Sequence, residues 1–70
     1  MPDLFADQTQ LEADRVALRF RLEEQTRAMR EAQKRYYRTR HTCDLDDSKA
    51  AERVVDQTLR RLEEVHRALA

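Results

Sequence analysis

The chain of 70 residues is long enough for one small domain, close to the size at which a single hydrophobic core barely offsets the entropy of ordering the chain. Fourteen basic and fourteen acidic side chains cancel, so the sequence provides no overall attraction to nucleic acid or to an anionic membrane. There is no Gly and only one Pro, which disfavours the tight turns and bulges of β-structure. Ala, Leu, Glu, Arg and Gln are frequent, and this composition predicts an all-α fold.

The beginning of the chain and its single cysteine bear on where the protein works. Residues 1–10 are acidic and contain no long apolar run, which is unlike a signal peptide or a membrane-spanning segment. Cys43 has no second cysteine with which to form an intrachain disulfide. We therefore expect a cytoplasmic protein that has no membrane partner.

The first predicted helix spans about residues 4–38. Its apolar side chains recur at spacings of three and four, which places them on one face, as in a helix bundle. They are Leu4, Leu11, Leu18, Leu22, Met29, Ala32 and Tyr36, with Gln25 as a polar member of the same stripe. Asp3 is one candidate for the cap at the start of this helix. The alternative is a capping box over residues 9–12, which would leave residues 1–8 frayed.

The second predicted helix spans about residues 44–69, with Asp44 as its cap. Its stripe is a regular alternation of four and three and consists of Ala51, Val55, Thr58, Leu62, Val65 and Leu69. The two stripes are out of phase by five residues, and the slip coincides with poor helix formers at residues 39–43. Basic residues precede this segment and acidic ones follow it, as at the end of one helix and the start of the next. A turn with an antiparallel return, forming a single domain over residues 1–70, is the economical explanation. The alternative is one long coiled-coil helix.

Apolar side chains outside the two stripes indicate that one hairpin does not complete its own core. Val54 and Leu59 widen the apolar arc of the second helix, and Ala13, Val16 and Phe20 form a patch nearly opposite the stripe of the first. We therefore expect a homo-oligomer, most simply a dimer that forms a four-helix bundle or coiled coil and serves as a small protein-interaction module. The residues expected at the interface are Leu11, Val16, Leu18, Phe20, Leu22, Met29, Val55, Leu59, Leu62, Val65 and Leu69.

The segment from residue 27 to residue 41 is rich in positive charge. Its basic side chains are Arg27, Arg30, Lys34, Arg35, Arg38 and Arg40. They could contact the phosphates of RNA or DNA while Tyr37 stacks on a base, and a small nucleic-acid-binding hairpin dimer is therefore the alternative function. The competing interpretation is a solvated helix surface, because Glu23–Arg27 and Glu31–Arg35 have the four-residue spacing of helix ion pairs.

Four potential metal ligands, His41, Cys43, Asp44 and Asp46, occur within six residues around the predicted turn. Zinc sites need further ligands at recurring spacings, and the other histidine, His66, is expected near the opposite end of the hairpin. A short turn also offers no pocket in which Cys43 could act on a substrate as a nucleophile. A polar turn explains the cluster, so we expect no metal, no cofactor and no catalytic residue, and hence a protein that is not an enzyme.

The stretch Tyr36-Tyr37-Arg38-Thr39-Arg40, followed by Asp44-Leu45, Ser48-Lys49, Glu52 and Val55-Asp56, resembles a pattern in small bacterial and phage-associated helical-hairpin proteins. The match covers about a third of the chain. It implies a shared turn structure to which Thr39, Arg40 and Lys49 contribute, with an arginine reaching the acids of the second helix, and it implies no known activity. In overall shape the expected dimer is also similar to the plasmid copy-control RNA-binding hairpin dimer, a likeness of fold that does not fix function.

Overall fold

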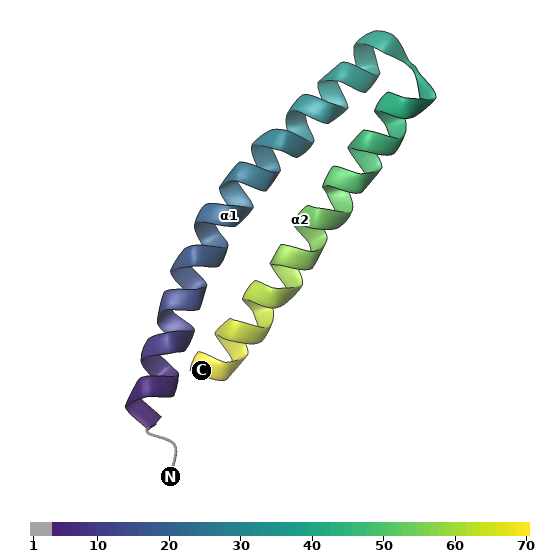
Figure 1. The fold of residues 1–70 in the computed structure, drawn as a ribbon. Coiled ribbons are helices and arrows are strands. Elements are labelled where there is room, and N and C mark those ends of the chain that lie inside the picture. The colour runs from purple at the N-terminus through teal and green to yellow at the C-terminus, as the bar shows by residue number, and fades with distance from the viewer. Residues whose placement is uncertain (1–3) are drawn as a thin grey trace.

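The computed structural model describes residues 4–70, with side chains from residue 7 onward. Helix α1 runs over Leu4–Thr39 and helix α2 over Thr42–Leu69 (Figure 1). The chain reverses direction between them, so the helices lie antiparallel and packed against each other. The predicted all-α hairpin is confirmed, and the alternative of one long helix is wrong.

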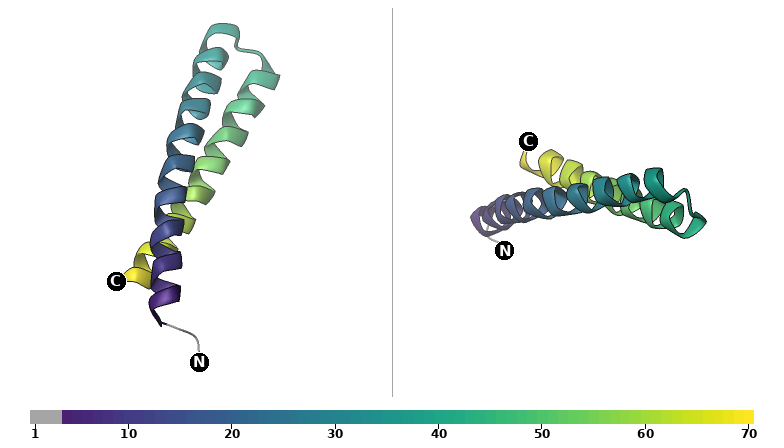
Figure 2. Two further views of the ribbon diagram at one scale, coloured as in Figure 1. Left: turned by 60° about the vertical axis from the view of Figure 1, so that its left-hand side comes forward. Right: turned by 90° about the horizontal axis from the view of Figure 1, so that it is seen from above.

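The hairpin is a rod measuring 56 × 16 × 14 Å. A 36-residue helix that rises about 1.5 Å per residue is about 54 Å long, so the length of the molecule is essentially that of α1. Seen from above, the two helices cross rather than lie strictly parallel (Figure 2). A shallow crossing of this kind is typical of helices whose side chains repeat at spacings of three and four.

Helix α1 begins at Leu4 as predicted, whereas α2 begins two residues earlier than predicted, and the predicted capping box and Asp44 cap are not used. Residues 9–12 are already inside α1, so the capping box is not used, and Asp3, the other candidate, lies outside the described residues. Helix α2 begins at Thr42, and its cap position is taken by His41 without a side-chain hydrogen bond. Asp44 therefore is not the cap. It lies in the first turn of α2, where a negative charge is favourable near the positive end of the helix dipole.

The core is a narrow seam between the two helices. Its buried apolar residues are Leu18, Ala32, Val55, Leu62 and Val65. Leu18, Leu62 and Val65 form a cluster toward the open end of the hairpin, against which half-buried leucines from both helices pack. Val65 is the most deeply buried of them, at 1% exposed. All five belong to the predicted stripes, which confirms the faces that the sequence pattern assigns to the seam.

Two polar pairs also cross the seam. The Thr58 hydroxyl donates a hydrogen bond to Oε1 of Gln25, and the Gln33 amide donates to Oε1 of Glu52 at 3.0 Å. Thr58 is buried, and Gln25 and Glu52 are half-buried. Sliding one helix past the other would separate both pairs, so these polar contacts help to fix the register of the hairpin.

Candidate functional site

The turn between the helices consists of Arg40 and His41 alone, and is shorter than the predicted segment 39–43. Arg40 has a φ of 56°, in the left-handed region that residues other than glycine seldom occupy. Its N–H donates to the carbonyl of Tyr36 at 2.7 Å, which closes α1 with a left-handed capping motif. Glycine is the usual residue at this position. The chain has none, and an arginine there bears a backbone cost of about 1–2 kcal/mol.

The Arg40 side chain folds back over two tyrosines of α1. Its guanidinium carbon lies 5.3 Å from the ring centroid of Tyr36 and 5.1 Å from that of Tyr37. The two ring centroids are 6.2 Å apart, with the planes inclined at 47°. Both distances from the guanidinium to a ring centroid are within the range of a cation–π interaction. Arg40 therefore contacts the aromatic pair next to the turn.

At the start of α2, the carboxylate of Asp44 is hydrogen-bonded by Thr39 rather than by an arginine. The Thr39 hydroxyl donates a hydrogen bond to Oδ2 of Asp44, and Oγ1 of Thr39 accepts one from the N–H of His41 at 3.3 Å. The predicted arginine clamp is wrong, because Arg40 is directed onto the rings and the shorter threonine is already within reach of Asp44.

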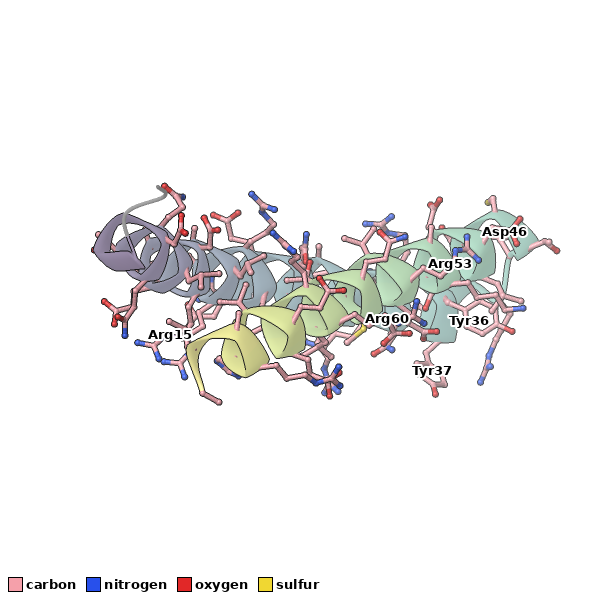
Figure 3. All side chains as sticks on the ribbon, turned by 90° about the horizontal axis from the view of Figure 1, so that it is seen from below. Arg15, Tyr36, Tyr37, Asp46, Arg53 and Arg60 are labelled. Carbon is pink, nitrogen blue, oxygen red and sulfur yellow. The ribbon has the colours of Figure 1, made fainter. Side chains whose placement is uncertain are left out.

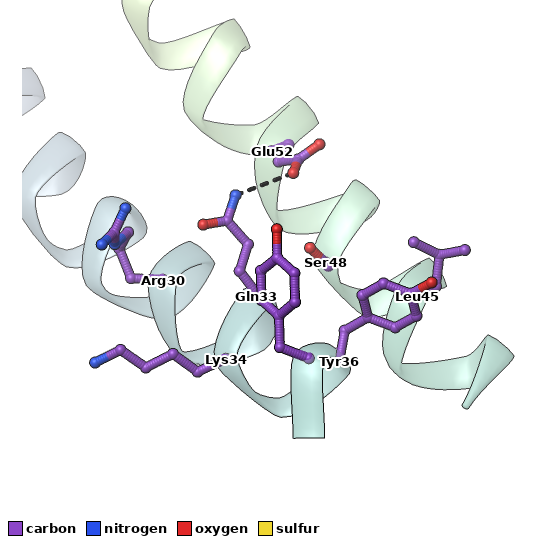
Figure 4. Close-up of a pocket in the computed structure, with 8 residues that line it drawn as sticks. Arg30, Gln33, Lys34, Tyr36, Leu45, Ser48 and Glu52 are labelled. Atoms are coloured by element: carbon purple, nitrogen blue, oxygen red, sulfur yellow. Dashed lines mark hydrogen bonds between the residues drawn. The ribbon is translucent and has the colours of Figure 1, made fainter. Parts of the chain in front are cut away.

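A half-open groove of about 510 Å³ lies between the helices next to the turn (Figure 4). Its lining residues are Arg30, Gln33, Lys34, Tyr36 and Tyr37 from α1 and Leu45, Ser48 and Glu52 from α2. The hydrogen bond from Gln33 to Glu52 joins its two walls. The groove combines positive charge, aromatic rings and hydrogen-bonding groups in one place.

A second, more open hollow adjoins the groove beside Tyr37. It measures about 370 Å³ and is lined by Glu31, Lys34, Tyr37 and Arg38. Tyr37 and Lys34 border both hollows. The Tyr37 side chain is 67% exposed and projects from the turn end of the hairpin (Figure 3). Much of its surface is therefore open to solvent beside both hollows.

All six basic residues predicted to contact nucleic acid are exposed, but the structure does not bring them together as one set. Arg30, Lys34 and Arg38 line the two hollows. Arg27 and Arg35 line neither hollow. Arg40, at the turn, stacks on the two tyrosines. The candidate surface is thus narrower than the basic segment as a whole.

The ion pairs around this surface differ from those predicted. Glu31 pairs with Lys34 at 3.7 Å, not with Arg35, and the expected pair of Glu23 with Arg27 is not formed. The other two ion pairs of the described residues lie near the C-terminal end of α2. Spacings of three and four bring side chains equally close on a helix, so spacing alone does not select the partner of an exposed charge.

The predicted oligomer-interface residues divide by exposure. Those buried or half-buried within the hairpin are Leu11, Leu18, Leu22, Met29, Val55, Leu62, Val65 and Leu69. Val16, Phe20 and Leu59 are exposed to 50%, 67% and 44%, and Val54 to 42%. These four side chains are therefore free to contact another molecule while the hairpin stays closed.

The potential metal ligands near the turn are not assembled into a site. Across residues 4–70, no three side chains of His, Cys, Asp or Glu lie close enough together to hold a metal ion. Cys43 is exposed, and Asp44 accepts the hydrogen bond from the Thr39 hydroxyl. In the same part of the chain, no helix has the length and apolar character needed to cross a membrane.

The α2 wall of the groove was missed by the sequence analysis, as was Gln33 on α1. Leu45, Ser48 and Glu52 recur at spacings of three and four, which places them along one edge of α2. In an antiparallel hairpin this edge lies opposite the end of α1. The spacing of these three residues could therefore have predicted the α2 wall of the groove.

Comparison with known proteins adds no candidate for the site. No protein-family model matches the chain, and neither a curated protein nor a solved structure matches it.

Proposed function

We propose that this chain is a small protein-interaction module that associates with a second copy of itself as a four-helix bundle. The distribution of apolar side chains carries the proposal. In the described part of the chain only five apolar residues are buried, whereas Val16, Phe20, Val54 and Leu59 remain 42–67% exposed. Burial stabilises a fold by about 25 cal/mol per Å² of apolar surface, so a core this thin offsets little of the cost of ordering the chain. A second copy would add apolar contacts at one of these exposed faces.

The exposed apolar residues lie on three sides of the hairpin. Val16 and Phe20 are each two residues from Leu18, about 200° around the helix, so they form an outer face of α1 that points away from α2. Val54 and Leu59 lie on opposite edges of the α2 stripe. Each edge belongs to a flank of the hairpin to which both helices contribute, and a four-helix bundle pairs such flanks.

The flank that carries Val54, here called the Val54 flank, suits a second hairpin better. Arg61, two turns after Val54, lines a shallow hollow together with Ala17 of α1, which places α1 residues on this flank. Ala28 lies three turns further along the same side of α1 and is exposed. Such small side chains let helix axes approach to about 8–10 Å. Charged side chains line the hollows on both flanks, so the cost of dehydrating them does not distinguish the flanks, and the small side chains of α1 favour the Val54 flank.

Sedimentation equilibrium of the full chain over a wide micromolar range tests self-association. We expect a dimer that dissociates on dilution, with a melting temperature that rises with protein concentration. A compact, helical wild-type monomer at every concentration would refute the proposal.

Three substitutions then identify the interface. Val54→Glu places a charge in the proposed interface and should weaken the dimer by at least about a hundredfold. Leu59→Glu makes the same kind of change on the opposite flank, and Phe20→Glu makes it on the outer face of α1. Both should leave the dimer intact. If either of these dissociates the dimer while Val54→Glu does not, self-association stands and the Val54 flank is the wrong surface.

A further inference from the structure

The basic side chains near the end of α1 are grouped around one aromatic ring. Arg30, Lys34 and Arg38 are four residues apart, so they follow one another along the helix at intervals of about 6 Å. Arg30 and Lys34 line the groove beside Tyr37, and Lys34 and Arg38 line the adjoining hollow, which Tyr37 also borders. Within the described residues, only Lys34 among these three has an ion pair, at 3.7 Å with an exposed Glu31. Most of this positive charge is therefore available to a ligand.

The ring of Tyr37 is exposed and supported at the same time. It is 67% exposed, yet the guanidinium of Arg40 lies 5.1 Å from its centroid and the ring of Tyr36 lies 6.2 Å away. A ring that is already oriented loses less conformational freedom when a ligand stacks on it. Arg40 provides this support from a left-handed backbone position at which glycine would be more stable. Strained backbone positions next to binding surfaces are a recurrent feature of functional sites.

We infer that this surface binds single-stranded nucleic acid, with a base stacked on Tyr37 and phosphates held by Arg30, Lys34 and Arg38. Every base has an aromatic face, so stacking on a tyrosine recognises single strands with little dependence on sequence. The bases of a duplex are already stacked on one another and do not reach the ring. The second carboxylate oxygen of Glu52 and the amide oxygen of Gln33 can accept hydrogen bonds from a base edge in the groove. Because the net charge of the chain is zero, we expect binding to be confined to this surface.

Fluorescence anisotropy of labelled oligo-dT and oligo-U with the full chain tests the site, with a duplex of equal length as comparator. Contacts to three phosphates predict that the logarithm of the association constant falls with the logarithm of the salt concentration with a slope of about −2, at about 0.7 per contact for single strands. Binding of either oligomer at low salt, more tightly than the duplex, supports the site. No change in anisotropy with either oligomer at low salt would overturn it.

Variants separate the stacking contact from the charges. Tyr37→Leu should weaken binding between about fivefold and about a hundredfold, with the salt slope unchanged, because it removes the aromatic face and no charge. Lys34→Gln should reduce the salt slope by about 0.7. Arg53→Gln is the matched control: it removes the same charge from an exposed residue on the far side of α2 from the seam (Figure 3) and should change neither quantity.

The inference fails if Tyr37→Leu binds as tightly as the wild type, or if Arg53→Gln weakens binding as much as Lys34→Gln. The second result would mean that diffuse charge attracts the strand rather than this surface. Far-UV circular dichroism of each variant should show unchanged helicity, because all three side chains are exposed and lie outside the seam.

Discussion

Substitution of Arg40 separates two opposing effects that meet at the turn. The residue bears a left-handed backbone cost, and its side chain lies over two tyrosine rings at 5.3 and 5.1 Å. An exposed cation–π contact contributes about 0.5–1 kcal/mol, so the two together contribute about 1–2 kcal/mol. Arg40→Ala loses these contacts and keeps the backbone cost, and should lower the free energy of unfolding by about 1–2 kcal/mol. Arg40→Gly loses the same contacts but relieves the backbone cost of about 1–2 kcal/mol, and should lie within about 1 kcal/mol of the wild type.

The measurement is urea denaturation followed by circular dichroism at one fixed protein concentration, because self-association would make apparent stability depend on concentration. A difference of 1 kcal/mol corresponds to about 4–8 °C in melting temperature for a domain of this size. Arg38→Ala is the control, since this exposed arginine has helical backbone and should change stability by no more than about 0.5 kcal/mol. If the alanine variant is as stable as the glycine variant, the left-handed conformation carries no cost. If both match the wild type, the ring contacts contribute nothing.

The remaining predictions concern the seam and the surface. Val65→Ala should cost about 2 kcal/mol in urea denaturation, because it removes two buried methyl groups from the most deeply buried side chain of the core. Thr58→Val should cost about 1–2 kcal/mol by leaving the Gln25 oxygen without its hydroxyl partner, and adding Gln25→Leu should restore most of the loss in a double-mutant cycle. Arg67→Gln removes an exposed ion pair with Glu63 and should change stability by less than about 0.5 kcal/mol at any salt concentration.

The seam of the hairpin was predictable because the sequence repeats along it. Leu18 and Val55 belong to stripes with spacings of three and four, and such a stripe identifies the buried face of a helix without knowledge of its partner. The shift in phase between the stripes also located the reversal of the chain. When one helix folds back on the other, both apolar stripes are buried between them. In a continuous helix the two stripes would face in different directions.

The turn and the groove could not be predicted in the same way. A left-handed capping residue is ordinarily signalled by Gly or Asn, and Arg40 is neither. Once that residue closes α1, its direction determines that the guanidinium lies on the tyrosines and that Thr39 meets Asp44. The groove depends on how far the crossing helices separate near the turn, and side-chain periodicity carries no information about a crossing angle. Partners of exposed charges such as Glu31 differ too little in energy to be selected by spacing.

The two proposed surfaces face opposite ways, and this makes their tests independent. Glu52 lines the groove and Val54 lies two residues later, about 200° around α2. A dimer formed through the Val54 flank would therefore leave both grooves open. Val54→Glu should abolish the dimer and change the affinity of each groove for an oligonucleotide by no more than about twofold, since effects at well-separated sites are additive to about 0.5 kcal/mol. Tyr37→Leu should do the reverse: weaken the oligonucleotide complex and leave the sedimentation of the dimer unchanged. If a helical Val54→Glu monomer no longer bound the oligonucleotide, the strand would have to contact both copies, and a site confined to one groove would be wrong.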